Sequence, residues 1–177
     1  MNHADHVNLL RGGAPTPGGV WADFGSGNGA FTLALAELLG PGGEIYSVDQ
    51  DRGALRNQER AMQSHFPQTT VHYLPADFTR PRLDLPLLDG LVLANALHFQ
   101  RYAAQGRVVE LLKSYLRPGG RFILVEYDVD RGNLWVPYPL SYQSWAKLAR
   151  ESGFAQTQLL ATRPSRFLQA IYAALSW

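Results

Sequence analysis

Short apolar runs alternate with helical patterns along most of the 177-residue chain. Residues 20–24 are typical of a short buried strand, and the segment 30–39 after them is apolar nearly all round, as in a helix packed on a sheet. The alternation continues, with further strands expected at 44–48, 70–74, 89–95 and 121–126, and helices at 52–64, 101–115 and 142–151. It predicts an α/β fold around a mostly parallel sheet.

Both ends of the chain depart from this alternation. Residues 4–11 predict a short helix, and a Gly- and Pro-rich lead-in follows it as far as residue 19. Between the third and fourth strands, residues 79–88 carry two prolines and predict a loop. Near the C-terminus, strands expected at 154–162 and 167–174 are separated only by residues 163–166, which suits an antiparallel hairpin and is too short for a crossover helix. We therefore expect seven strands, the last two forming a hairpin.

Composition narrows the classes of function. The net charge is +1, and the 14 arginines among the 16 basic residues are scattered, so there is no nucleic-acid-binding stripe. Cysteine is absent, which excludes disulfides, thiolate nucleophiles and Cys-ligated metals. His3 and His6 have the spacing of a metal pair without a third ligand, so we expect no metal. Without a secretory signal or a membrane-spanning run, a cytoplasmic protein is expected.

A glycine-rich turn, Gly25-Ser26-Gly27-Asn28-Gly29, lies between the first strand and its helix. Glycine lets the backbone approach a ligand closely, and the helix offers free N–H groups to a polar or negative group. Twenty residues after Gly29, the acid Asp49 ends the second strand. This order predicts a site for an adenosine-containing ligand. Asn28 has a simpler explanation, since asparagine tolerates left-handed backbone, and Asp49 could be a solvated acid.

Five segments in this order resemble the motifs of class I S-adenosylmethionine-dependent methyltransferases, from Val20 to Ala174. They are Asp23–Gly29, Asp49, Ala76-Asp77-Phe78, Asp89–Phe99 and Leu116–Phe122. The resemblance implies a three-layer Rossmann-like sandwich, with a seven-stranded sheet ending in an antiparallel hairpin. It also implies one methyltransferase domain over residues 1–177, with 1–19 as a short N-terminal helix and lead-in and 20–177 as the core.

The resemblance implies the cofactor S-adenosylmethionine and assigns parts of it to residues. The turn from Gly25 to Gly29 meets the amino-acid tail, with Asp23 fixing the turn and the ammonium through water. Asp49 accepts the ribose hydroxyls. The remaining contacts are Asp77 with the adenine amino group, Phe78 and Gln50 beside the adenine, and Asn95 at the amino-acid end. A plain turn-forming role for Asp77 stays open.

The catalytic candidate is His98, just past the fourth strand and near the expected methyl position. A histidine with its ordinary pKa of about 6.5 can act as a base near neutrality. A local hydrogen-bonding role that shapes the loop is the alternative, and Tyr127 and Asp128 are second choices. A general base is needed only if the acceptor must lose a proton.

The acceptor is expected to be a small molecule methylated on oxygen or nitrogen, meeting segments 1–17, 95–104 and 127–140. The aromatic residues Tyr127, Trp135 and Tyr138 either face a planar molecule or pack on the sheet edge. The pocket is then either open or completed by a second copy in a homo-oligomer. The sequence leaves the acceptor, the attacked atom and catalytic competence open.

Two other functions stay open. Residues 25–30 also satisfy the looser fingerprint G-x-G-x-x-A of NAD(P)-dependent oxidoreductases. Against this, the Tyr-x-x-x-Lys pair of short-chain dehydrogenases is missing, since Tyr142 and Lys147 are five residues apart, and no strands are left for a nicotinamide half. The other alternative is a non-catalytic protein that binds S-adenosylmethionine.

Overall fold

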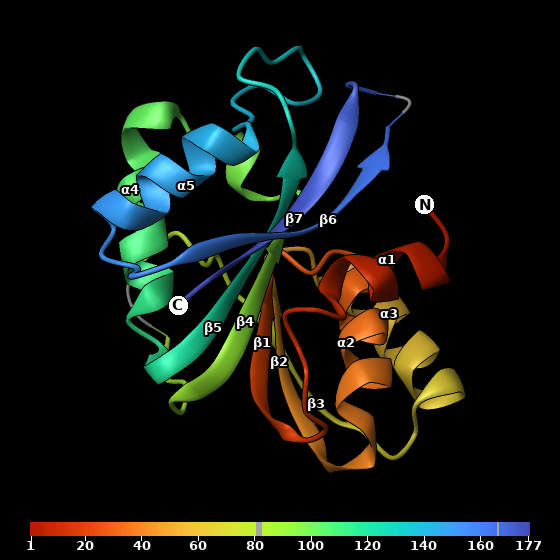
Figure 1. The fold of residues 1–177 in the computed structure, drawn as a ribbon. Coiled ribbons are helices and arrows are strands. Elements are labelled where there is room, and N and C mark those ends of the chain that lie inside the picture. Colours follow the sequence, from red (N-terminus) through yellow and green to blue (C-terminus); the bar gives the residue numbers. More distant parts are fainter. Residues whose placement is uncertain (81–82, 166) are drawn as a thin grey trace.

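A computed structural model describes residues 1–80, 83–165 and 167–177, in which one seven-stranded sheet lies between two layers of helices (Figure 1). The strands are β1 (Gly19–Phe24), β2 (Gly43–Asp49), β3 (Thr70–Pro75), β4 (Leu88–Ala94), β5 (Leu116–Tyr127), β6 (Thr157–Pro164) and β7 (Ala170–Ser176). The helices are α1 (His3–Leu10), α2 (Ala30–Leu39), α3 (Arg52–His65), α4 (Tyr102–Lys113) and α5 (Tyr142–Glu151), with 3-10 turns η1 (Gly40–Gly42) and η2 (Leu97–Phe99). The predicted fold class is confirmed.

The strand order is β3-β2-β1-β4-β5-β7-β6. Strands β1 to β5 are parallel, and β7 runs antiparallel to both β5 and β6. The order reverses at β1, which pairs with β2 on one side and with β4 on the other. In an open α/β sheet, this reversal leaves a crevice at the carboxyl ends of the strands, where ligands bind.

Each face of the sheet is covered by its own helices (Figure 1). Phe24 and Leu91 point to the side where Val108 of α4 and Trp145 of α5 are buried. Neighbouring strand positions point the opposite way, toward the core formed with α1, α2 and α3. This two-residue alternation explains why the central strands are apolar throughout, because both of their faces are buried.

Side-chain caps begin two of the helices, α3 and α5. Asp51 Oδ1 accepts from Gly53 N at 2.7 Å and Ser141 Oγ accepts from Ser144 N at 3.2 Å. The N-terminal helix α1 is held to the sheet by an ion pair between Asp5 Oδ1 and Arg163 Nη1 of β6, at 2.7 Å. No helix in the described ranges is both long and apolar enough to cross a membrane.

Several boundaries differ from the sequence prediction. Strand β5 begins at Leu116, which pairs with Leu88, and an irregularity separates this pair from the next one, Gly90 with Arg121. Strand β6 begins only at Thr157 and not at the predicted residue 154. Phe154 packs against Phe122 instead, with their ring centroids 5.5 Å apart. The turn η2 was not predicted. The predicted loop 79–88 and hairpin turn 163–166 include residues 81–82 and 166, which lie outside the described residues.

Gly106, inside α4, provides a test of the packing. A Cβ there would lie 3.7 Å from Leu148 Cδ1, an ordinary contact. Glycine inside a helix costs roughly 0.5–1 kcal/mol relative to alanine, so Gly106→Ala should raise the free energy of unfolding by about that amount. Urea unfolding measures it as a higher midpoint at an unchanged slope. The control is Gly120→Ala, whose Cβ would lie 2.9 Å from Arg117 O and should destabilise. A lower midpoint for Gly106→Ala would contradict this packing.

Candidate active site

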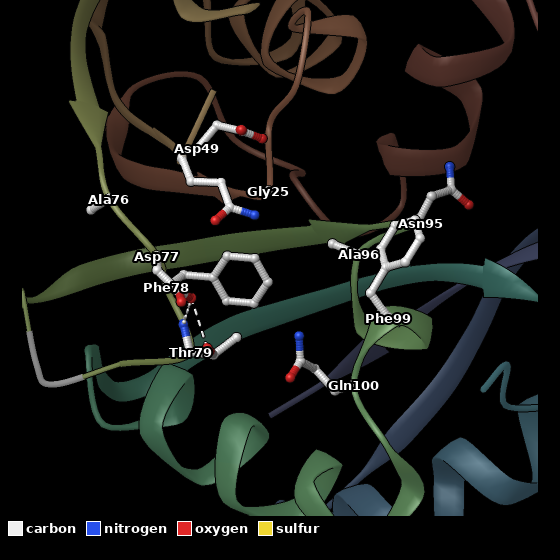
Figure 2. Close-up of a pocket in the computed structure, with 11 residues that line it drawn as sticks. Gly25, Asp49, Ala76, Asp77, Phe78, Thr79, Asn95, Ala96, Phe99 and Gln100 are labelled. Carbon is white, nitrogen blue, oxygen red and sulfur yellow. Dashed lines mark hydrogen bonds between the residues drawn. The ribbon is translucent and has the colours of Figure 1, made fainter. Parts of the chain in front are cut away.

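An open cavity of about 210 Å³ lies where β1, β2, β3 and β4 end (Figure 2). Six of the eleven residues predicted to bind the cofactor line it: Gly25, Asp49, Gln50, Asp77, Phe78 and Asn95. The prediction missed its other lining residues, which are Ala76, Thr79, Ala96, Phe99 and Gln100. The lining does not include His98 or the other five predicted cofactor residues, which are Asp23, Ser26, Gly27, Asn28 and Gly29.

The carboxylate of Asp49 braces the glycine turn. Its Oδ2 accepts from Gly27 N at 2.8 Å, and its Oδ1 accepts from Asp51 N at 2.8 Å. An ionised carboxylate offers about four acceptor positions, so each oxygen keeps a lone pair for a ligand hydroxyl. Asp49 is therefore hydrogen-bonded to the protein backbone and is not simply a solvated acid. Both of its oxygens can still bind a ligand diol.

Two glycines of the turn have no room for a side chain. Gly25 has φ +71°, and a Cβ there would lie 2.7 Å from Ala96 Cβ and 3.2 Å from the Phe78 ring. Gly29 has φ +86°, and its Cβ would lie 2.3 Å from Gln58 Cγ. Asn28 is different. Among the described residues that are not glycine, only Asn95 and Gln169 have positive φ, so the left-handed explanation of Asn28 is wrong.

A buried polar layer supports the turn from below. Ser47 Oγ donates to Gln58 Oε1 at 2.9 Å and lies 2.8 Å from Ser26 Oγ. Gln58 of α3 is fully buried, and its Nε2 has no partner among the described residues. The burial of Gln58 was not predicted, because a single glutamine in a polar helix gives no local indication that it is buried.

Asp23 lies beneath the turn, with 1% of its surface exposed. Thr32 Oγ1 donates to its Oδ2 at 2.6 Å. Burial raises the pKa of Asp23 to about 7, and the charge of Asp49 adds to the increase, while the hydrogen bonds from Thr32 oppose it. Asp23 does not line the cavity, so any interaction with a ligand must pass through another group.

The loop after β3 combines a turn with a wall of the cavity. Asp77 Oδ1 accepts from Thr79 N at 2.9 Å and from Thr79 Oγ1 at 2.7 Å, while Oδ2 pairs with Arg80 Nε at 3.1 Å. The Thr79 bonds chiefly hold the pKa of Asp77 below its usual value. Asp77 thus makes the turn contact that was left open, and it also lines the cavity, with the Phe78 ring beside it (Figure 2).

Asn95, in the cavity wall, has a side-chain oxygen that is free to accept a hydrogen bond from a ligand. Its φ is +50°, a conformation that asparagine tolerates better than most residues, and its backbone N donates to Val125 O at 2.9 Å. Its Oδ1 is buried and has no partner in the described part of the chain. A buried acceptor left unbonded costs about 1–3 kcal/mol, so a ligand donor at this position would be favoured.

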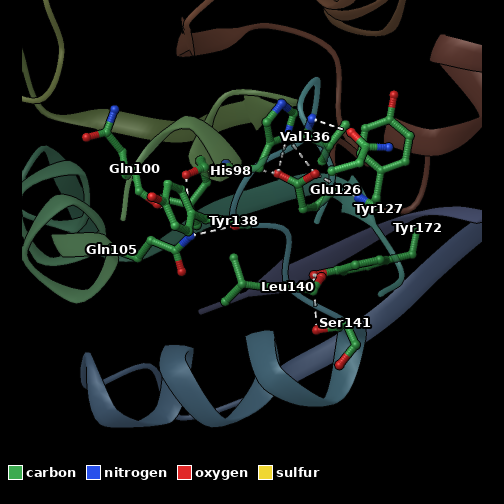
Figure 3. A network of polar contacts seen from close by, with 12 residues as sticks. His98, Gln100, Gln105, Glu126, Tyr127, Val136, Tyr138, Leu140, Ser141 and Tyr172 are labelled. Carbon is green, nitrogen blue, oxygen red and sulfur yellow. Dashed lines mark hydrogen bonds and ion pairs between the residues drawn. The ribbon is translucent and has the colours of Figure 1, made fainter. Parts of the chain in front are cut away.

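His98 is not among the residues that line the cavity, and its ring forms a buried pair with Glu126 (Figure 3). Its side chain is 4% exposed, and Nδ1 lies 2.8 and 2.9 Å from the two carboxylate oxygens. The carboxylate also accepts from Tyr127 N at 2.8 Å. Because a carboxylate only accepts hydrogen bonds, Nδ1 is the donor in this pair. Glu126 is not among the predicted site residues, because nothing in the local sequence pairs it with His98.

The remaining candidates do not converge on the cavity. Burial raises the pKa of the half-buried Tyr127, and Asp128 Oδ1 accepts from Tyr142 N at 2.8 Å at the start of α5. His3 lies 2.8 Å from Glu37, and the ring of His6 packs on Phe31. The described residues contain no group of three or more side chains suited to a metal ion.

Comparison with known proteins shows the family to which the chain belongs. The family described as Methyltransferase domain matches residues 16–162. The chain belongs to this methyltransferase family. Mouse (Mus musculus) acetylserotonin O-methyltransferase is 30% identical over 169 residues, covering 91% of this chain and 38% of the mouse protein. The chain therefore spans less than half the length of this relative. The 2-phytyl-1,4-naphtoquinone methyltransferase of Trichormus variabilis is 25% identical over 113 residues, covering 63% of this chain and 48% of that protein.

Solved structures show the same fold for the methyltransferase domain. A 1,6-didemethyltoxoflavin-N1-methyltransferase from Burkholderia thailandensis has a TM-score of 0.74 at 21% identity and covers 98% of this chain and 77% of its own. Its crystals contain 1,6-didemethyltoxoflavin and S-adenosylhomocysteine. The magnesium protoporphyrin IX methyltransferase from Synechocystis PCC 6803, solved with bound SAM, has a TM-score of 0.71 at 19% identity, with coverage of 98% and 77%. The class I methyltransferase fold expected from the motifs is confirmed.

The raised pKa of Asp23 makes a prediction about stability. Its pKa is about 7 in the folded chain against an ordinary 3.8, so the folded state holds a proton that the unfolded state has lost. The corresponding stability is fully present below about pH 4 and is lost as pH rises through about 7. The melting temperature of the wild type should therefore fall more steeply between about pH 4 and 7 than that of Asp23→Asn. Asp84→Asn, at an exposed acid, should keep the wild-type slope. Parallel curves for wild type and Asp23→Asn would contradict the assignment.

Proposed function

We propose that this chain is an S-adenosylmethionine-dependent methyltransferase acting on a small molecule, at an oxygen or nitrogen atom. The supporting observation is the convergence of Asp49, Asp77 and Asn95 with the glycine turn on one cavity at the strand-order reversal. The family match and the relatives named as methyltransferases agree with this proposal. When bound, S-adenosylmethionine supplies a methyl group on a sulfonium centre that leaves as a neutral thioether.

The residues present fit this group. Asp49 offers free lone pairs on both oxygens to a ribose diol, and Phe78 offers a ring beside the adenine. The unpartnered Oδ1 of Asn95 suits the ammonium of the amino-acid tail. Gly25 keeps space free between Phe78 and Ala96. Asp23, Ser26, Gly27, Asn28 and Gly29 set the shape of the turn, and Gln50 closes one side.

We assign His98 the role of general base and Glu126 that of its positioning residue. Glu126 fixes the tautomer and ring orientation, so that Nε2 can take a proton from an acceptor hydroxyl or amine. Asn95 and Phe99, on either side of His98 in the chain, line the cavity, so an acceptor held at His98 would lie at the edge of the cofactor site, as attack on the methyl group requires. A homo-oligomer that completes the acceptor side is part of the proposal.

The first test is cofactor binding by calorimetry. S-adenosylmethionine should bind, and Asp49→Ala should weaken it at least about tenfold, because the diol acceptor and the brace on Gly27 are both removed. Asp84→Ala removes an exposed carboxylate of the same charge and should leave the affinity unchanged. Binding of NADH in place of S-adenosylmethionine would establish the oxidoreductase alternative instead.

The second test concerns the base. A screen of small phenols, carboxylic acids and amines, read out as S-adenosylhomocysteine release, identifies an acceptor. With that acceptor, His98→Ala should lower kcat about 100-fold without changing cofactor affinity, and Glu126→Gln should lower kcat and shift its pH profile. His65→Ala, at an exposed histidine ending α3, is the control. Unchanged turnover in His98→Ala would leave His98 with the loop-shaping role alone.

A further inference from the structure

A second cavity, of about 330 Å³, lies at the end of the sheet opposite the glycine turn. It opens where β1 and β4 begin, beside the irregular first part of β5 (Figure 1). Strand β1 has six residues, so at about 3.3 Å a residue the two cavities lie roughly 20 Å apart. The two share no lining residue in the described part of the chain, so the proposed methyl transfer makes no use of the second one.

The indole nitrogen of Trp21 is an unused donor in the wall of this second cavity. Trp21 is a core residue with 3% of its surface exposed, and its Nε1 donates to no atom of the residues that the structure describes. Gly19, in the same wall, has φ +87°, and a Cβ there would lie 3.4 Å from Trp21 Nε1. The glycine therefore leaves the indole N–H open to the cavity. A nearly buried donor of this kind favours a ligand that supplies the acceptor.

Arg121 adds a guanidinium that lacks a counter-ion. It is half-buried at the start of the regular part of β5, where it pairs in register with Gly90. Its Nη1 donates to Gly13 O at 3.4 Å, and no carboxylate of the described residues forms an ion pair with it. A guanidinium carries five N–H donors in a fixed fork, so most of them remain free for a ligand oxygen.

The other two charged side chains in the described lining satisfy each other. Asp89 Oδ1 pairs with Arg117 Nη1 at 2.7 Å, and Asp89 Oδ2 accepts from Val20 N at 2.7 Å. Because the charges of Asp89 and Arg117 cancel, Arg121 leaves this lining with one net positive charge. One such charge suits a monovalent oxyanion, whereas a doubly charged phosphate would also face the carboxylate of Asp89.

The rest of the lining has room for more than an inorganic ion. Pro15 and Pro17 offer apolar rings, and Gly18, Gly119 and Gly120 have no side chain to fill the space. The volume falls at the lower end of the range of about 300–1,000 Å³ found for small-molecule sites. The apolar part of a small ligand can therefore be buried against the two prolines.

We propose that this second cavity binds a small organic carboxylate. The carboxylate accepts from the Arg121 guanidinium and from Trp21 Nε1, and its apolar body packs on Pro15 and Pro17. This site is independent of the proposed methyl transfer, because the cofactor cavity lies at the other end of the strands.

The test is titration of benzoate into the ¹⁵N-labelled full chain, followed by the indole N–H signals in NMR spectra. The chain has four tryptophans, and the signal lost in Trp21→Phe assigns Trp21. Benzoate should shift the Trp21 signal until it saturates and leave the other three in place. Arg121→Gln should weaken benzoate at least about tenfold, because a charge-assisted hydrogen bond is lost, and Arg121→Lys should recover part of the affinity. Arg150→Gln, at an exposed arginine in the last turn of α5, is the matched control and should bind benzoate as the wild type does.

Three further titrations define the ligand class and the location of the site. Benzyl alcohol, which has the same ring without the charge, should leave the Trp21 signal in place, and inorganic phosphate should bind more weakly than benzoate. Saturation with S-adenosylhomocysteine should leave the benzoate affinity unchanged.

An unshifted Trp21 signal, or equal benzoate affinity in Arg121→Gln and the wild type, would overturn the inference. So would an equal shift by benzyl alcohol, tighter binding of phosphate, or competition between benzoate and S-adenosylhomocysteine. Arg121-dependent benzoate binding in a chain that does not bind S-adenosylhomocysteine would instead refute the methyl transfer and keep the carboxylate site.

Discussion

The contact on which the site depends is the bond from Gly27 N to Asp49 Oδ2. It joins the turn after β1 to the end of β2, two strands that the parallel sheet places side by side. The turn can take this path only because Gly25 and Gly29 adopt positive φ where a Cβ would strike Ala96 or Gln58. Backbone geometry and one carboxylate therefore create the space before any ligand enters it.

The two helix layers supply different residues to the site around this contact. Helices α2 and α3 lie on one face and follow β1 and β2, so they carry the turn and the buried support from Gln58. Helices α4 and α5 lie on the other face. The segment that leads into α4 carries His98, and residues 128–141 lead into α5. The strand-order reversal brings the two sets together at one edge of the sheet. The cavity is thus lined by segments that lead to helices on both faces of the sheet.

Sequence reasoning was strongest where a local pattern has one physical meaning. Alternating apolar runs predicted all seven strands, and the glycine turn with Asp49 predicted the edge where the cavity lies. It failed where tertiary contacts decide the outcome. Nothing local indicates that Gln58 and Gln105 are buried, that Glu126 holds His98, or that Phe154 leaves strand β6 to pack on Phe122. Asn28 and Asn95 illustrate the same limit, since the residue type suits left-handed backbone at both positions and only Asn95 adopts it.

Hydrogen exchange with and without S-adenosylhomocysteine tests directly whether the cofactor binds at the glycine turn, because it locates the ligand without requiring a known acceptor. We predict that the ligand slows exchange in residues 25–29, 49–51, 76–79 and 95–96, while exchange around Glu37 and His65, near the amino ends of β2 and β3, is unchanged. The absence of protection at the glycine turn, or protection centred on Glu37 and His65, would contradict it.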